Sequence, residues 1–264
     1  MLTVAVANQK GGVGKSSVVL GLASAAAQRD IPTLVVDMDP QANTSVALGP
    51  QLGTASFTVN DVLYADRRGS AAEAIQVSTW SPTVALIPAS LELAERDTDT
   101  RLGSEHRLAK ALDDPELRKG FQLCLVDCPP SLGRLVSNAL IAADRLLVVT
   151  EPSYPASQGV ANIMQTLETI REHYNPRLQL AGVIVNKVPA RGREAAHRVQ
   201  ELTQHLDDGV IWHPLLPQRA VIAEAMGAGV GIHQLGARSR TVSEIFAAYL
   251  MQLLTEPATE RSPQ

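Results

Sequence analysis

The chain has 264 residues, of which 45% are hydrophobic and 3% aromatic, and its formal net charge is −4. This length suits one α/β domain or two small ones around a large aliphatic core, and the charge excludes a chain that is basic throughout but not a local basic face. No segment approaches the roughly 20 consecutive apolar residues that cross a bilayer, and the two cysteines do not make a disulfide framework.

Apolar runs predict the strands, and apolar residues at helical spacing predict the helices. In chain order, strands are expected at 2–7, 32–36, 84–88, 121–126, 145–150, 180–185 and 210–212. Helices are expected at 17–28, 59–64, 90–112 with a break near Gly103, 132–142, 155–173, 192–206, 220–226 and 239–254. Continuous apolar strands that alternate with helices are typical of an α/β fold, a mostly parallel twisted sheet with helices on both faces.

The same pattern sets the domain organisation. No linker interrupts it, so residues 1–254 are predicted to form a single domain. Residues 255–264 hold two prolines and mixed charge and are expected to be a flexible tail. Because the chain opens directly with a core strand, we expect no signal peptide and a cytoplasmic location.

A glycine-rich loop joins the first predicted strand to the first predicted helix. Its glycines let successive backbone N–H groups point into one concavity, and the helix N-terminus adds positive charge, which suits phosphates. Lys15 can reach the outer phosphates, and the Ser16 hydroxyl can bind Mg²⁺. Gln9 stands where the standard pattern has glycine, and a second lysine, Lys10, opens the loop. The predicted nucleotide-binding residues here are Lys10, Gly11, Gly12, Val13, Gly14, Lys15, Ser16 and Ser17.

Acidic residues follow two further predicted strands. Asp37 and Asp39 come after the second strand, where one carboxylate can face the γ-phosphate and orient the attacking water. Asp127 ends a later strand at the Walker B position, which holds Mg²⁺, often through water, and the loop 131–133 after it would sense the γ-phosphate. The structural alternatives are a solvated turn for the first pair and a helix N-cap for Asp127.

The loop resembles the deviant Walker A motif of the ParA/MinD ATPases. The resemblance spans most of the chain, favours the ParA branch, and extends to Val36-Asp37-Met38-Asp39-Pro40-Gln41-Ala42-Asn43, Leu125-Val126-Asp127-Cys128-Pro129-Pro130-Ser131-Leu132-Gly133 and Val185-Asn186-Lys187. It implies a P-loop NTPase fold with ATP and Mg²⁺ as cofactors.

The resemblance also implies roles for single residues. Lys10 would reach across a dimer to the ATP of the other subunit, Asp39 would position water, and Asp37 would help the metal shell or hold the loop. Catalysis is therefore expected of Lys10, Lys15 and Asp39, and metal binding of Ser16, Asp39 and Asp127.

For adenine, the resemblance implies a hydrogen bond from Asn186, whose amide edge suits the N6/N7 pair of the base. The backbone of Pro217, Gln218 and Arg219 would supply the other wall of the pocket. A turn-forming asparagine is the structural alternative for Asn186.

Basic residues are modestly in excess late in the chain, and family members bind DNA non-specifically through arginines in this region once dimeric. The candidate DNA contacts are Arg191, Arg193, Arg219 and Arg240. A solvated surface is the alternative, and Gln218-Arg219 departs from the Arg-Asn pair of many relatives.

Together these features predict an ATPase that dimerises on ATP, binds double-stranded DNA non-specifically and segregates chromosome or plasmid DNA with a ParB-type partner. Its weak hydrolysis would be stimulated by partner and DNA. A MinD-like membrane-recruited ATPase is the alternative, but the tail after residue 254 lacks a basic amphipathic face, and the apolar stripe of the last helix is expected to be core. An iron–sulfur protein is a third reading, which the spacing of Cys124 and Cys128 disfavours.

Overall fold

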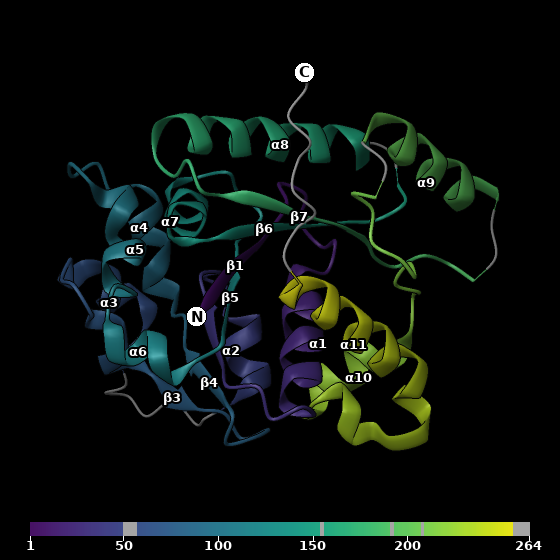
Figure 1. The fold of residues 1–264 in the computed structure, drawn as a ribbon, viewed down its shortest axis with the longest axis horizontal. Coiled ribbons are helices and arrows are strands. Elements are labelled where there is room, and N and C mark those ends of the chain that lie inside the picture. The colour runs from purple at the N-terminus through teal and green to yellow at the C-terminus, as the bar shows by residue number, and fades with distance from the viewer. Residues whose placement is uncertain (50–56, 154–155, 191–192, 207–208, 256–264) are drawn as a thin grey trace.

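The computed structural model describes residues 1–49, 57–153, 156–190, 193–206 and 209–255 (Figure 1). Its sheet has seven strands in the order β3-β4-β2-β5-β1-β6-β7. The strands are β1 (Leu2–Ala7), β2 (Thr33–Asp37), β3 (Gln76–Val77), β4 (Val84–Ile87), β5 (Leu123–Asp127), β6 (Arg145–Thr150) and β7 (Gln179–Val185). All neighbouring pairs are parallel except β3 with β4, which confirms the predicted mostly parallel α/β sheet.

Helices cover both faces of the sheet. They are α1 (Lys15–Ala27), α2 (Asn43–Leu48), α3 (Val59–Ala65), α4 (Ala94–Asp97), α5 (Arg107–Ala111), α6 (Pro115–Gly120), α7 (Arg134–Ala142), α8 (Ala156–His173), α9 (Arg193–His205), α10 (Ala220–Ala228) and α11 (Arg240–Leu254). Short 3₁₀ turns lie at η1 (Ser70–Ala74), η2 (Leu91–Leu93), η3 (Ser104–His106) and η4 (Ile232–Ser239).

The two faces have separate aliphatic cores. Along β1, Ala5 and Ala7 join the core made with α3, α5, α7 and α8, whereas Val4 and Val6 join the core made with α1, α2, α10 and α11. This alternation follows from the two-residue repeat of a strand. Figure 1 shows α7 and α8 on one side of the sheet and α1, α10 and α11 on the other.

Short segments accompany both edges of the sheet. β3 pairs antiparallel with β4 through only two residues. At the other edge, the segment 210–217 runs beside β7 and the residues after it, with isolated bridges from Val183 to Ile211 and from Val188 to Pro217. The predicted strand at 210–212 is reduced to the one bridge at Ile211, which is made by the Val183 N–H to Val210 O at 2.8 Å and the Trp212 N–H to Val183 O at 2.9 Å. Pro214 has no N–H with which to extend it.

The last helix packs into the core, as predicted. Phe246, Tyr249, Leu250 and Leu253 of α11 are each at most 1% exposed. The expected tail lies outside the described residues from position 256 onward. Among the described residues, no helix is long and apolar enough to cross a membrane.

Candidate nucleotide-binding site

The sheet brings the predicted motifs together at the carboxyl ends of its strands. β1 lies between β5 and β6, so the glycine-rich loop leaves the middle of the sheet. Asp127 at the end of β5 is in register with both Val6 of β1 and Asp37 of β2. The loop and the two aspartates therefore meet at the carboxyl ends of adjacent strands, where parallel sheets bind ligands.

The loop has the backbone that its glycines predict. Gly12 and Gly14 have φ values of 76° and 95°, which favour glycine, and Gly14 is the N-cap of α1. A Cβ at Gly14 would also lie 2.2 Å from Asn186 Nδ2, so any side chain there would displace the asparagine. The loop is thus specified by both its conformation and its neighbour.

Lys15 is buried beneath the loop. It is 7% exposed, and its Nζ lies 3.5 Å from the Lys10 carbonyl oxygen. Burial lowers the pKa of Lys15, and the negative charges of Asp127 and Asp39 oppose that shift. The Lys15 ammonium therefore lies near the carboxylates of Asp127 and Asp39, at the N-terminus of α1. A helix N-terminus is where phosphates are expected to bind.

A second segment holds the loop from the side of β7. The Asn186 side chain donates to Val13 O at 2.8 Å and accepts from the Lys187 N–H at 2.7 Å. The Lys187 ammonium donates to Gly12 O. The Gln218 N–H donates to Val188 O at 2.9 Å, so residues 216–218 lie next to 186–188. The structure thus brings together the two segments expected to flank adenine.

The two strand-end aspartates are buried side by side. Asp37 accepts hydrogen bonds from the Ser45 N–H at 2.8 Å, the Ser45 hydroxyl at 2.7 Å and the Asp39 N–H at 3.1 Å. Asp127 accepts from the Thr44 hydroxyl at 2.6 Å. Burial raises the pKa of both carboxyl groups. The charge of Asp127 raises the pKa of Asp37 further, while the hydrogen bonds from Ser45 lower it. The hydrogen bond from Thr44 likewise opposes the rise at Asp127.

The described residues hold no group of three or more His, Cys, Asp or Glu side chains that could bind a metal ion by themselves, so a divalent cation here would need further ligands beside Asp127. Asp127 Oδ1 is buried and accepts no hydrogen bond from the described residues. Asp37, Asp39 and Asp127 lie together with raised pKa values at the two buried members, so a positive charge here would relieve their repulsion. Oxygen ligands with the Ser16 hydroxyl nearby are the set that Mg²⁺ prefers.

Asp39 has a different setting from Asp37. Its carboxylate accepts the Gln41 N–H at 2.9 Å, and the residue is half-buried, whereas Asp37 is fully buried. Asp39 therefore has room to meet a water molecule, while Asp37 holds the loop together.

The Lys10 side chain contacts residues that follow β6. Its Nζ donates to Glu151 Oε1 at 2.8 Å and to the Ser153 hydroxyl at 2.6 Å. The Lys187 ammonium lies 3.9 Å from the other oxygen of Glu151. The backbone N–H of Lys10 donates to Asn8 Oδ1 at 3.1 Å, so both the main chain and the side chain of this lysine are fixed.

The candidate DNA contacts are dispersed. Arg219 is exposed and precedes α10, close to the segment 216–218. Arg240 is exposed at the start of α11 and lines a cavity with Gln28 and Arg29, beyond the end of α1 that lies away from the glycine-rich loop. Arg191 lies outside the described residues, and Arg193 is the first residue of α9.

Sequence reasoning missed four residues that shape the site. Thr44 and Ser45 belong to α2, for which no element was predicted, and Glu151 and Asn8 follow strands without standing out in composition. The available signal for α2 was the apolar run Val46-Ala47-Leu48 after the two hydroxyls. The cysteines Cys124 and Cys128 are both fully buried, and burial raises the pKa of each thiol.

Comparison with known proteins identifies the family. A family model described as an AAA domain matches residues 1–180. The sporulation initiation inhibitor protein Soj of Bacillus subtilis is 30% identical over 241 residues, which cover 90% of this chain and 92% of Soj. The chromosome-partitioning ATPase Soj of Thermus thermophilus is 35% identical over 232 residues, 88% of this chain and 87% of that protein. The chain belongs to the ParA/Soj family of partitioning ATPases.

Solved structures of similar fold agree with this membership. A cobyrinic acid a,c-diamide synthase from Mycobacterium smegmatis with bound ADP and magnesium is 28% identical, with a TM-score of 0.74 over 87% of this chain and 93% of that one. The McdA–ATP complex from Cyanothece has a TM-score of 0.85 over 98% of this chain and 99% of its own, at 19% identity. The ParA/Soj chain thus shares its fold with proteins solved with nucleotide.

Proposed function

We propose that this ParA/Soj-family chain is an ATP-dependent dimerising switch that binds DNA non-specifically and segregates chromosome or plasmid DNA with a ParB-type partner. Slow ATP hydrolysis, stimulated by the partner and DNA, resets it, and the protein works at the nucleoid in the cytoplasm. The observation that supports the proposal is that buried Lys15 lies under the glycine-rich loop and faces the carboxylates of Asp127 and Asp39. Relatives named for chromosome partitioning support the biological role.

In this proposal, residues of one subunit bind the nucleotide. The N–H groups of the loop 10–17 surround the phosphates, Lys15 bridges the outer ones, and Asn186 with the segment 217–219 encloses adenine. Ser16, Asp39 and Asp127 hold Mg²⁺, which when bound neutralises charge on the β- and γ-phosphates. Asp39 also orients the attacking water.

Dimerisation completes the site. Lys10 lies at the mouth of the loop, where its side chain can leave Glu151 and project into a facing subunit. A positive charge supplied from a second subunit stabilises the transition state of phosphoryl transfer, so assembly of the dimer controls turnover. Doubling the arginines by symmetry also strengthens DNA binding, which counterion release drives.

DNA binding with different nucleotides tests the proposal. Fluorescence anisotropy on two unrelated duplexes is measured with ATP, ADP or no nucleotide, for the natural chain and for Lys15→Gln. We expect binding to both duplexes with ATP, much less with ADP, and none for Lys15→Gln. If the dimer neutralises about four to six phosphates, log affinity falls with log salt at a slope near −4 to −5. Equal binding without nucleotide would contradict the proposal.

The ParB-type partner is tested separately. ATP hydrolysis is measured with the partner and DNA added singly and together, and the expected result is greatest turnover with both. The same assay with Lys15→Gln controls for contaminating ATPases. Turnover that neither addition changes would exclude the regulated cycle.

A further inference from the structure

The segment after Asp127 connects the nucleotide loop to the start of α7. Pro130 lies against the glycine-rich loop, since its Cβ is 3.7 Å from the place that a Cβ would take at Gly11. The segment ends at Gly133, the residue before α7. Its middle residue, Ser131, is exposed. The position of this segment therefore depends on what fixes the start of α7.

A side chain from a distant part of the chain fixes that start. Asp97, the last residue of α4, accepts the Leu135 N–H at 3.1 Å and the Ser131 hydroxyl at 3.5 Å. Gly133 packs so closely on this carboxylate that a Cβ there would lie 2.3 Å from Asp97 Oδ1. The first N–H groups of a helix lack partners within the helix, so a carboxylate here acts as a cap and also favours the helix dipole.

The chain around Asp97 is bound to α7 by other contacts. The Arg134 guanidinium donates to the Ser104 hydroxyl at 2.8 Å and pairs with Glu105 at 3.0 Å. The Asn138 side chain donates to Ser104 O at 2.9 Å. These bonds hold the segment 97–105 against α7 without involving the segment after Asp127.

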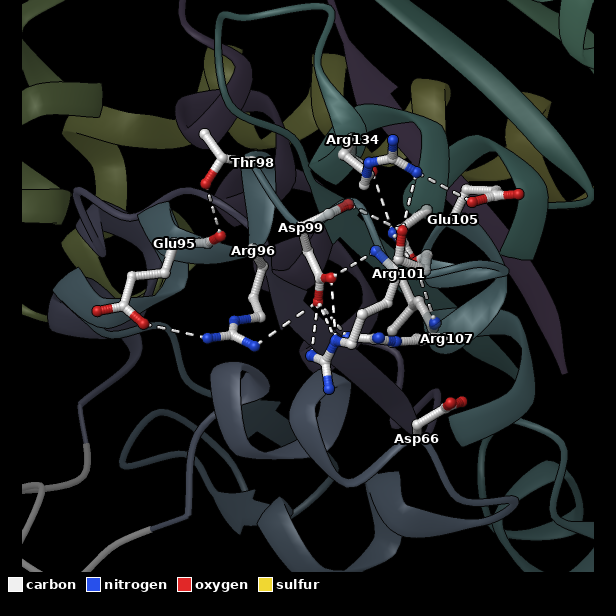
Figure 2. Close-up of polar contacts among 12 residues, drawn as sticks. Asp66, Glu95, Arg96, Thr98, Asp99, Arg101, Glu105, Arg107 and Arg134 are labelled. Carbon is white, nitrogen blue, oxygen red and sulfur yellow. Dashed lines mark hydrogen bonds and ion pairs between the residues drawn. The ribbon is translucent and has the colours of Figure 1, made fainter.

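Asp99 anchors the same segment from its other side. Its carboxylate is 8% exposed and lies 2.6 Å from both Arg101 and Arg107 and 3.7 Å from Arg96 (Figure 2). Because three arginines surround its carboxylate, Asp99 has little freedom to move, and Asp99 is only two residues after Asp97. Asp97 therefore presents its oxygens from a rigid support.

We infer that Asp97 is a positioning residue for ATP hydrolysis, which holds the backbone of residues 131–135 in place at the γ-phosphate end of the site. The inference rests on the proposed placement of ATP. In the proposed function, the glycine-rich loop and Lys15 bind ground-state ATP, and Asp97 contacts neither of them. Loss of Asp97 should therefore lower turnover and leave ATP affinity nearly unchanged.

Substitutions at Asp97 test this split. With saturating ATP and Mg²⁺, Asp97→Ala lowers kcat about fivefold to tenfold, which corresponds to about 1 to 1.4 kcal/mol of barrier. The Kd for ATP, measured by calorimetry, stays within about twofold. Asp97→Asn keeps an oxygen that can accept the Leu135 N–H and restores most of kcat. Glu95→Gln is the matched control, because Glu95 lies on the same helix with its side chain 71% exposed and should leave both quantities unchanged.

Gly133→Ala tests the contact from the other side. Its methyl group would displace the Asp97 carboxylate, so it should lower kcat about as much as Asp97→Ala. In the Asp97→Ala background the atoms that it meets are gone, so the second change should cost little. If Asp97→Ala does not fold, Asp97→Asn and Gly133→Ala carry the same comparison.

Two results would overturn the inference: an unchanged kcat for Asp97→Ala and Gly133→Ala, or a loss of ATP affinity as large as the loss of kcat. A lower melting temperature with an unchanged kcat would also overturn the inference, because the contact of Asp97 with α7 would then serve stability alone. Failure of the natural chain to bind ATP at all would instead overturn the proposed function.

Discussion

Asp37 and Asp39 are separated by one residue, yet the fold gives their carboxylates different surroundings. Asp37 is fully buried and receives three hydrogen bonds, two of them from Ser45. Asp39 is half-buried and receives one from the Gln41 N–H. The residue with spare acceptor capacity and access to water is therefore the better candidate for orienting the nucleophile.

We expect Asp39→Ala to bind ATP and dimerise but to hydrolyse ATP at least about tenfold more slowly, roughly 1.4 kcal/mol of barrier. Its carboxylate would act on water and not on ground-state ATP. Single-turnover hydrolysis and calorimetry on the same preparation measure the two quantities. Asp37→Asn is the comparison, because it should reduce stability through the lost bonds to Ser45. Normal turnover of Asp39→Ala would make Asp39 a structural turn residue.

Among the elements, α1 and α11 pack through a glycine. A Cβ at Gly21 would lie 2.2 Å from the Phe246 ring, which is 1% exposed and has no room to retreat. The close approach of the two helices therefore requires the missing side chain at this position.

We expect Gly21→Ala to destabilise the protein by about 1–3 kcal/mol, because overpacking a filled core outweighs the better helix propensity of alanine. Gly227→Ala is the matched control in α10, where a Cβ would meet no described heavy atom within 4 Å. The control should be neutral or stabilising by about 0.5–1 kcal/mol. Urea unfolding of both variants provides the comparison. Equal effects of the two changes would contradict the packing argument.

The Asp99 cluster predicts a dependence of stability on pH. The hydrogen bonds from Arg101, with one further bond from Arg107, hold the pKa of Asp99 far below its usual range, although burial opposes the shift. Such a carboxylate stabilises the fold above the pKa of the unfolded state, and the contribution is lost as the pH falls through the folded-state value. Asp99→Asn should cost on the order of 3 kcal/mol at pH 7, since Arg107 is 3% exposed and loses its ionic partner.

Thermal and urea unfolding of the natural chain and Asp99→Asn between pH 7 and pH 3 measure this contribution. The difference between the two proteins should be greatest at neutral pH and shrink below about pH 4. Glu116→Gln serves as the control. The side chains of Glu116 and its partner Lys119 are 84% and 73% exposed, so this ion pair should contribute little to stability. A difference that stays constant with pH would show that the charge of Asp99 is not the cause.

Much of the fold was predictable because its signals are local. The strand, glycine loop and helix around Lys15 lie within one short stretch, and the break near Gly103 separates α4 from α5 as expected. Thr44 and Ser45 were not predictable, because a run of small polar residues after Pro40 is typical of a turn. Their hydroxyls are buried only because Asp127 and Asp37 accept from them, and that pairing joins residues far apart in the sequence.

For the whole molecule, the question is how one subunit meets another. Lys10 is bound by Glu151 and Ser153 of its own chain, and the lysine lies at the edge of the site and not beneath it, with its side chain 33% exposed. Its role in the proposed function therefore depends on a change of partner when the dimer forms.

We expect Lys10→Ala to reduce ATP-dependent dimerisation and turnover more than it reduces the affinity of the monomer for ATP. Loss of a charge supplied from a second subunit can lower turnover on the order of 10³-fold or more in phosphoryl transfer. Size-exclusion chromatography with light scattering and a non-hydrolysable ATP analogue measures the dimer. Lys119→Ala, an exposed lysine of α6, is the control. An unchanged dimer together with unchanged turnover would rule this role out.

The covered edges of the sheet restrict how copies of the chain can associate. An open strand edge offers unpaired N–H and C=O groups to any other chain, and that pairing leads to aggregates without defined order. Here the two-residue β3 closes one edge, and the segment 210–217 accompanies the other. Short, irregular edges of this kind disfavour the addition of another strand. If copies of the chain gather on DNA as proposed, their association can then stay reversible, because it does not proceed through added strands.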